Sequence, residues 1–225
     1  MSIPKHILDK FPKLSNDNLL NNLSLPSSRN KMILDTDTAN EIDDQFALAW
    51  TLLSEDKIDL LGVTAEPYSF EHHKEELFEA YDIITKNKKI DVSNQELVSD
   101  YSNWVNGLID SKIHPKEIYF DTPKEGVEKS YQEIINIYKK LDKNYEGKVF
   151  RGSPKYLENL DEPLDTESSQ FIIDMCLKYP NEKIYVCAIG CLTNIASALL
   201  MKPEIIKNMV VVWTAGFPTF SFNHN

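Results

Sequence analysis

The stretch ILDTDTANEIDD, residues 33–44, crowds carboxylates between two apolar segments and contains no Lys, Arg or His. Its acidic residues are Asp35, Asp37, Glu41, Asp43 and Asp44. The apolar residues before it, 32–34, predict a strand, and QFALAWTLLS (45–54), apolar nearly all round, predicts a helix buried against a sheet. Ligands of open α/β sheets bind at the carboxyl ends of strands, so the acidic loop between these two elements is a candidate binding site.

Strand-like and helix-like segments alternate along the rest of the chain and predict an α/β fold. Further strands are expected at 58–65, 184–189 and 209–214, and further helices at 71–86, 127–141, 168–179 and 192–200. This alternation is typical of an open, mostly parallel sheet with helices on both faces. Residues 91–123 show no clear periodicity and are expected to be irregular. The polar residues 1–30 are expected to form an N-terminal extension, which precedes an α/β domain of residues 31–225.

Composition excludes several classes of partner. The net charge of −11 argues against a nucleic-acid-binding surface, which needs a basic face. No apolar run is long enough to span a bilayer, and the N-terminus has no apolar segment of a secretory signal, so we expect a cytoplasmic protein with no membrane partner. The three cysteines lack metal-site spacing and are expected to be reduced and buried. A small-molecule ligand is the remaining expectation.

Carboxylates packed this closely repel one another unless they are solvated or neutralised. A charge run on a solvated surface is one interpretation, and a bound divalent cation is the other. Oxygen-only ligands favour Ca²⁺ or Mg²⁺ over zinc. An EF-hand loop is excluded, because counting from Asp35 puts Asn40 where glycine is needed and Phe46 where glutamate is needed.

Two enzyme families share features of this region. MILDTDTA (32–39) resembles the DxDx[T/V] nucleophile motif of haloacid-dehalogenase-like phosphotransferases, although Ala39 occupies the last motif position. The longer pattern of strand, DxD, loop, DD and helix resembles the inosine/uridine-type nucleoside hydrolases, whose usual form is DxDPGxDD. AIGCLTNIASALLMKPEI (188–205), MVVVWTAG (209–216) and KVFRGS (148–153) are similar to further segments of that family, in the same order.

The second resemblance implies hydrolysis of the N-glycosidic bond of a ribonucleoside to ribose and free base, with Ca²⁺ as the cofactor and a role in nucleoside salvage. By position, Asp37 is similar to the residue that binds calcium and takes a proton from the attacking water. Asp44 is similar to a second calcium ligand, and Asp43 to a residue that hydrogen-bonds a ribose hydroxyl. Thr193 matches a position whose backbone carbonyl binds calcium, although Thr193 and Asn194 also fit a capped helix start. Asp35 is expected to hydrogen-bond within the loop.

The chain departs from the family in ways that keep alternatives open. The acidic loop is two residues longer and lacks Pro-Gly, and Glu66-Pro67 replaces the family's Ala-Gly-Asn segment. The sequence ends after the strand at 209–214, where family members continue with further ligands, so we expect a domain truncated at its C-terminal side. A non-catalytic or partner-dependent remnant is therefore the alternative to an active hydrolase. An exposed sheet edge at that side would favour a homo-oligomer.

Overall fold

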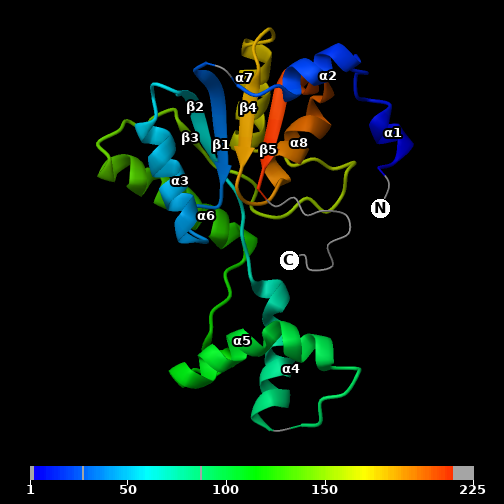
Figure 1. Ribbon diagram of the computed structural model, residues 1–225, viewed down its shortest axis with the longest axis vertical. Coiled ribbons are helices and arrows are strands. Elements are labelled where there is room, and N and C mark those ends of the chain that lie inside the picture. The colour runs from blue at the N-terminus through cyan, green and yellow to red at the C-terminus, as the bar shows by residue number, and fades with distance from the viewer. Residues whose placement is uncertain (1–2, 27, 87, 215–225) are drawn as a thin grey trace. The chain divides into compact units, whose positions relative to one another are not determined.

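The computed structural model describes residues 3–26, 28–86 and 88–214 (Figure 1). The chain divides into two compact units. One unit comprises the residues up to Tyr68 together with those from Pro123 onward, and the other comprises Ser69–Thr122. The second unit is thus inserted in the chain between the second strand of the first unit and the helix that begins at Pro123.

The larger unit contains an all-parallel sheet, which confirms the predicted fold class (Figure 1). Within the described residues the strand order is β3-β2-β1-β4-β5. The strands are β1 (Asn30–Thr36), β2 (Ile58–Ala65), β3 (Val149–Phe150), β4 (Ile184–Ala188) and β5 (Met209–Trp213). Four of them lie where the sequence predicts strands, whereas the two-residue strand β3, within KVFRGS, is too short for a periodic pattern.

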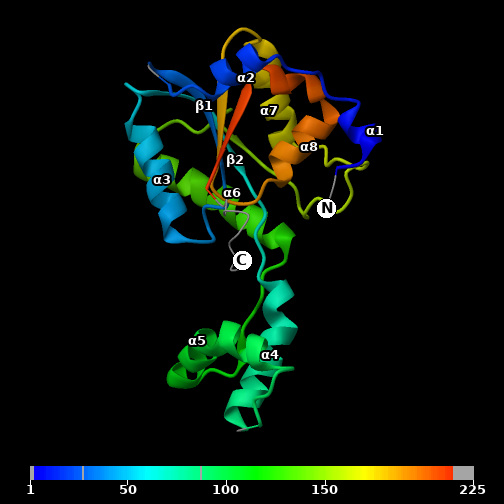
Figure 2. The ribbon, with the colours of Figure 1, turned by 45° about the vertical axis from the view of Figure 1, so that its right-hand side comes forward.

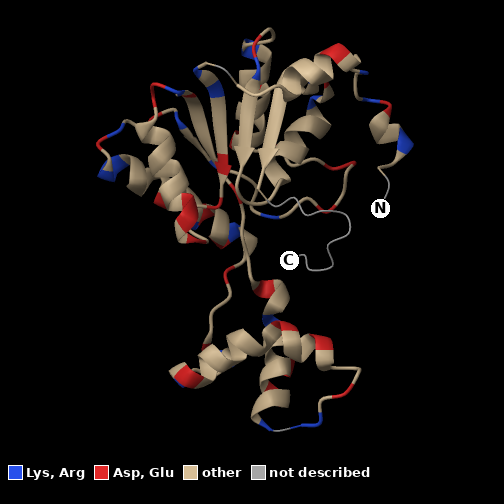
Figure 3. Cartoon of the chain, in the orientation of Figure 1, with Lys and Arg blue, Asp and Glu red and all other residues tan. Residues whose placement is uncertain are grey.

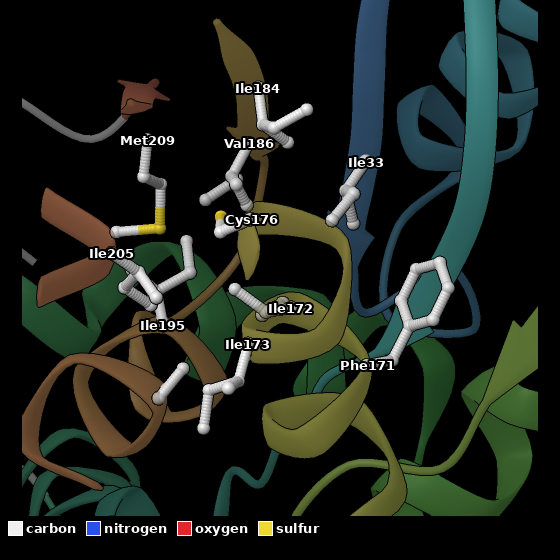
Figure 4. Packing of buried hydrophobic residues seen from close by; sticks show 12 residues of the cluster. Ile33, Phe171, Ile172, Ile173, Cys176, Ile184, Val186, Ile195, Ile205 and Met209 are labelled. Atoms are coloured by element: carbon white, nitrogen blue, oxygen red, sulfur yellow. The ribbon is translucent and has the colours of Figure 1, made fainter. Parts of the chain in front are cut away.

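Helices cover both faces of this sheet, as predicted (Figures 1 and 2). On one face, α3 (Ile42–Leu53) and α6 (Pro123–Lys140) pack on a core that includes Leu34, Leu48, Val63 and Ile134. On the other face lie α7 (Glu167–Lys178), α8 (Thr193–Met201) and the 3-10 helix η3 (Pro203–Lys207). Figure 4 shows the core on this second face, in which Ile33, Ile172, Ile184 and Val186 are fully buried.

Helix α3 packs against the sheet, as predicted, but one side of this nearly all-apolar helix is exposed. Leu48 and Leu52 point into the core, whereas Phe46 and Trp50 are 68% and 77% exposed. The physical reason is that α3 packs against strand β2 and helix α6 along one side, and no described element covers the opposite side. The N-terminal residues form two helices, α1 (Lys5–Leu8) and α2 (Asn16–Leu23).

The smaller unit is helical, so the expectation that residues 91–123 are irregular is wrong. It contains α4 (Lys74–Thr85), α5 (Gln95–Ser111) and the 3-10 helices η1 (Glu71–His73) and η2 (Pro115–Glu117). Tyr101, Val105 and Leu108 recur along one face of α5 and pack with Leu77 and Ala80 of α4. That spacing was present in the sequence, but interspersed polar residues weakened the apolar pattern.

Two other expectations concern membranes and cysteines. In the part of the chain that the structure describes, no helix has the length and apolar character needed to cross a membrane. The three cysteines are free, as expected, and Cys176 is buried. Cys187 and Cys191 are only partly buried, which corrects the expectation for those two.

Candidate active site

The carboxyl ends of β1, β2 and β4 bring the acidic loop together with residues distant in sequence. Strand β1 is central and pairs with both neighbours, so Asp35 lies opposite Thr64 of β2 and Ala188 of β4. In Figure 3, red acidic segments mark the lower end of the sheet and the first turn of α3. The loop therefore lies at the edge where ligands bind in open parallel sheets.

Asp35 is the buried centre of a hydrogen-bond network. Its side chain is 0% exposed, and its Oδ1 accepts hydrogen bonds from Thr64 Oγ1 at 2.6 Å and from Asn194 Nδ2 at 2.9 Å. Asn194 Nδ2 also donates to the carbonyl of Ala65 at 2.9 Å, and its Oδ1 accepts from the backbone N–H of Ser153 at 3.3 Å. Asp35 thus links β1 to β2 and α8, instead of bonding within the loop as expected.

Asp37 and Asp44 are also buried, with 7% and 5% of their surfaces exposed. Thr36 Oγ1 donates to Asp44 Oδ1 at 2.5 Å. Asn40, in the lengthened part of the loop, donates from Nδ2 to Asp37 Oδ2 at 3.1 Å, and its backbone N–H donates to the Asp37 carbonyl at 2.7 Å. Asn40 therefore holds the Asp37 side chain from within the loop. The burial contradicts the interpretation of the acidic run as an entirely solvated surface.

The fourth buried acid is Glu66, directly after β2, whose side chain is 0% exposed. When ionised, neither carboxyl oxygen of Glu66, nor Oδ2 of Asp35, has a hydrogen-bond donor among the described residues, whereas a proton on either acid allows a hydrogen bond between the two. The nearby carboxylates of Asp35 and Asp37 raise the free-energy cost of ionising Glu66. We call Asp35, Asp37, Asp44 and Glu66 the carboxylate cluster.

Burial raises the pKa of every member of the carboxylate cluster. Burial and, second to it, the charge of Asp44 together raise the pKa of Asp37 to about 7. Burial also raises the pKa of Asp44 to about 6, against the opposing effect of the hydrogen bond from Thr36. The pKa of Glu66 lies well above its usual range because of burial and the neighbouring Asp35. In the metal-free protein the cluster therefore favours protonated carboxyl groups.

The raised pKa of Asp37 predicts how stability depends on pH in metal-free protein. A carboxyl whose pKa is raised on folding stabilises the fold below its unfolded pKa, near 4, and loses that contribution as the pH rises through about 7. The loss is on the order of 4 kcal/mol for a shift of this size. We expect Asp37→Asn to become more stable than wild type as the pH rises from about 4 to about 8 in EDTA. Urea unfolding of both proteins at each pH measures this; a constant difference between them would contradict it.

Gly190, two residues after β4, makes room for two of these carboxylates. A Cβ at this position would lie 2.2 Å from Glu66 Oε2 and 2.9 Å from Asp37 Oδ1, distances that side chains do not tolerate. Only a residue without a side chain lets the backbone approach both acids. The β4 loop therefore forms one wall of the carboxylate cluster.

We expect Gly190→Ala to destabilise the protein by about 1–3 kcal/mol, because the added methyl group must displace Glu66 or Asp37. Gly107→Ala is the matched control, since Gly107 lies in helix α5 with nothing within 4 Å of the added atom. Alanine there should stabilise the helix by about 0.5–1 kcal/mol. Chemical denaturation measures both changes, and a Gly190→Ala variant as stable as wild type would refute the crowding.

The structure brings together some of the predicted site residues and separates others. Asp37 and Asp44 are close enough for their charges to interact, whereas Asp43, in the first turn of α3, is exposed. Thr193 is buried as the first residue of α8, and its hydroxyl accepts a hydrogen bond from Cys191 Sγ at 3.5 Å. The capping interpretation of Thr193 and Asn194 is wrong, because α8 begins without a side-chain cap.

Sequence reasoning missed Glu66, Asn194 and Gly190 as parts of the site. Their places in the sequence were the available signal. Glu66 directly follows a strand expected beside the acidic loop, and Gly190 and Asn194 flank the turn that follows another expected strand. Within the described residues, no three His, Cys, Asp or Glu side chains already converge as a metal-binding group. The site thus contains buried carboxylates, but among the described residues it is not a complete metal-coordination site.

A parallel sheet with buried carboxylates at its carboxyl edge defines an α/β protein with a polar site suited to hydrolysis or cation binding. The model of the inosine-uridine preferring nucleoside hydrolase family matches residues 32–219. The chain belongs to this family. A comparison with curated proteins finds no match. The family match gives no support to the phosphotransferase interpretation of DTDTA.

Proposed function

We propose that this protein hydrolyses the N-glycosidic bond of ribonucleosides in a calcium-dependent reaction, with Asp37 as the general base. The observation that carries the proposal is the pairing of Asp37 and Asp44, buried at the edge of the sheet in a chain of the nucleoside hydrolase family. Family membership supports nucleoside hydrolysis in general. The calcium ion and the residue roles are the proposed part.

The chemistry of the donor set supports calcium. All four members of the carboxylate cluster offer oxygen, the donor atom that Ca²⁺ prefers. Three oxygens of ionised Asp35 and Glu66 are buried without a hydrogen-bond donor among the described residues, and a nearby cation would compensate them. The pKa values of Asp37 and Asp44 are raised because these carboxyl groups are buried, and a buried carboxylate without a compensating positive charge favours its protonated form.

Asp37, Asp44 and the backbone carbonyl of Thr193 are the proposed ligands of the ion. Bound calcium would supply positive charge that polarises a water molecule and orients ribose hydroxyls. Asp37 accepts a proton from the water molecule while the oxygen of that water forms a bond to C1′ of the ribose. The N-glycosidic bond breaks, the base leaves with the bonding electrons, and it takes up a proton from solvent. The exposed Asp43 accepts a hydrogen bond from a ribose hydroxyl.

The carboxylates also stabilise the reaction electrostatically. The transition state of glycoside hydrolysis carries positive charge on the sugar ring, and preorganised negative groups lower its energy. Thr36 and Asn40 hold the two carboxylates that would face the sugar and ion, through the hydrogen bonds to Asp44 and Asp37. These bonds preorganise the loop before any ligand binds.

Product analysis tests this function. Incubation with inosine or uridine and CaCl₂ should release ribose and free base in equal amounts, whereas p-nitrophenyl phosphate with Mg²⁺ should remain intact. Unchanged nucleosides together with turnover of the phosphate ester would contradict the proposal. Chromatography of the base and a reducing-sugar assay of the ribose measure the two products independently.

A further inference from the structure

Glu66 is a buried acid that the proposed reaction does not use. It follows β2 directly, its side chain is 0% exposed, and its backbone N–H donates to the Thr36 carbonyl at 2.8 Å. In its ionised form Glu66 has no hydrogen-bond donor among the described residues, and its side chain lies within hydrogen-bond distance of another acid, Asp35. Burying a polar group without a partner is costly, and native proteins satisfy the great majority of such groups. The position of Glu66 therefore needs a physical explanation.

The side chain of Glu66 faces the interior of the candidate site. Its Oε2 and the Oδ1 of Asp37 both approach the Cα of Gly190, where an added Cβ would lie 2.2 Å and 2.9 Å from them. Glu66 also lies next to Asp35, and the charges of Asp35 and Asp37 both disfavour its ionised form. Glu66 comes from the segment directly after β2, Asp37 from the loop after β1, and Gly190 from the loop after β4. The loops after three neighbouring strands thus bring Glu66 close to Asp37, the proposed general base.

No basic side chain among the described residues compensates this charge. The ion pairs of the described part of the chain involve other acids, for example Lys31 with Asp59 and Arg151 with Glu128. The largest electrostatic influences on the carboxylate cluster likewise include no lysine, arginine or histidine of the described residues. An ionised cluster therefore needs positive charge from outside the described residues, and a bound cation would supply it.

We infer that Glu66 supports cation binding at Asp37 and Asp44, by adding buried negative charge beside Asp37. The inference rests on the proposed function, because it concerns the same ion. Glu66 is assigned to support and not to coordination, since no three acidic side chains of the described residues already converge on one metal position. Groups that surround metal ligands commonly change metal affinity by about 10–100-fold when they are altered. Glu66 is thus a positioning residue that acts through Asp37.

Calcium titration of metal-free protein by calorimetry tests this role, with thermal unfolding in EDTA as the second readout. Glu66→Gln removes the charge and keeps the size and shape of the side chain. We expect it to weaken calcium binding by about 10–100-fold while the Tm in EDTA stays close to that of wild type, because glutamine fills the same space and can hydrogen-bond to Asp35 in the same way. The matched control is Glu146→Gln, an exposed acid before β3 whose charge is not among the largest influences on the carboxylate cluster, and it should change neither quantity.

The outcomes separate this inference from the proposed function. If wild type binds calcium and Glu66→Gln binds it equally well, the inference is overturned and the calcium proposal stands. A lower Tm in EDTA with unchanged affinity would also overturn it, since that pattern indicates a purely structural glutamate. Wild type that binds no calcium would overturn both. Glu66→Asp, which keeps the charge, should bind calcium more tightly than Glu66→Gln, and equal weakening by both variants would contradict the charge argument.

Discussion

Asp37→Asn should lower kcat for ribonucleoside hydrolysis by about a thousandfold or more. A positioned general base contributes about 10²–10⁴-fold to such a reaction, and asparagine cannot accept the proton from water. The same substitution removes a proposed ligand of the calcium ion, and that loss adds to the effect. Initial rates of base release from inosine and uridine, at saturating CaCl₂, measure the change.

The control for this prediction must show that the variant is folded. Asp37→Asn removes a buried charge, so in EDTA near neutral pH it should be at least as stable as wild type. Glu146→Gln serves as the control substitution, because Glu146 is exposed and its charge is not among the largest influences on Asp37 or Asp44. A folded Asp37→Asn protein with activity within about tenfold of wild type would exclude Asp37 as the general base.

The fold could be predicted because its elements have strong local patterns. Apolar β-branched runs such as Ile58–Ala65 and Met209–Trp213 are strands, and their alternation with amphipathic segments leads to a parallel sheet. Helix α5 was missed because residues such as Asp100, Asn103 and Asn106 interrupt its apolar spacing. Its burial is decided by packing against α4, which a short sequence window does not contain.

The site was predictable only where its residues are close in sequence. Asp37 and Asp44 belong to one loop, and the burial of the strand before it predicts their position at the edge of the sheet. Asn194 reaches Asp35 from 159 residues away, so its role as a bridge depends on the order of strands β2, β1 and β4. Glu66 reads as an ordinary loop acid until the register of β1 with β2 places it beside the acidic loop.

Removal of calcium should abolish hydrolysis, which is the other large effect that this account predicts. Without the cation, burial keeps the pKa of Asp37 at about 7, so a large fraction of the general base is protonated at neutral pH. Loss of the ion also removes the charge that polarises the water, an effect worth several kcal/mol in metal-dependent hydrolases. Both consequences act on the same step, and both should be reversed when calcium is restored.

The most direct test is therefore the rate of base release from inosine and uridine after chelation with EGTA and again after excess CaCl₂ is added. The account predicts that activity falls to background with EGTA and returns with calcium in wild type, but not in Asp37→Asn. Hydrolysis that continues at an unchanged rate in EGTA would contradict a calcium-dependent centre. Absence of base release under both conditions would contradict the account as well, and would favour a non-catalytic or partner-dependent member of the family.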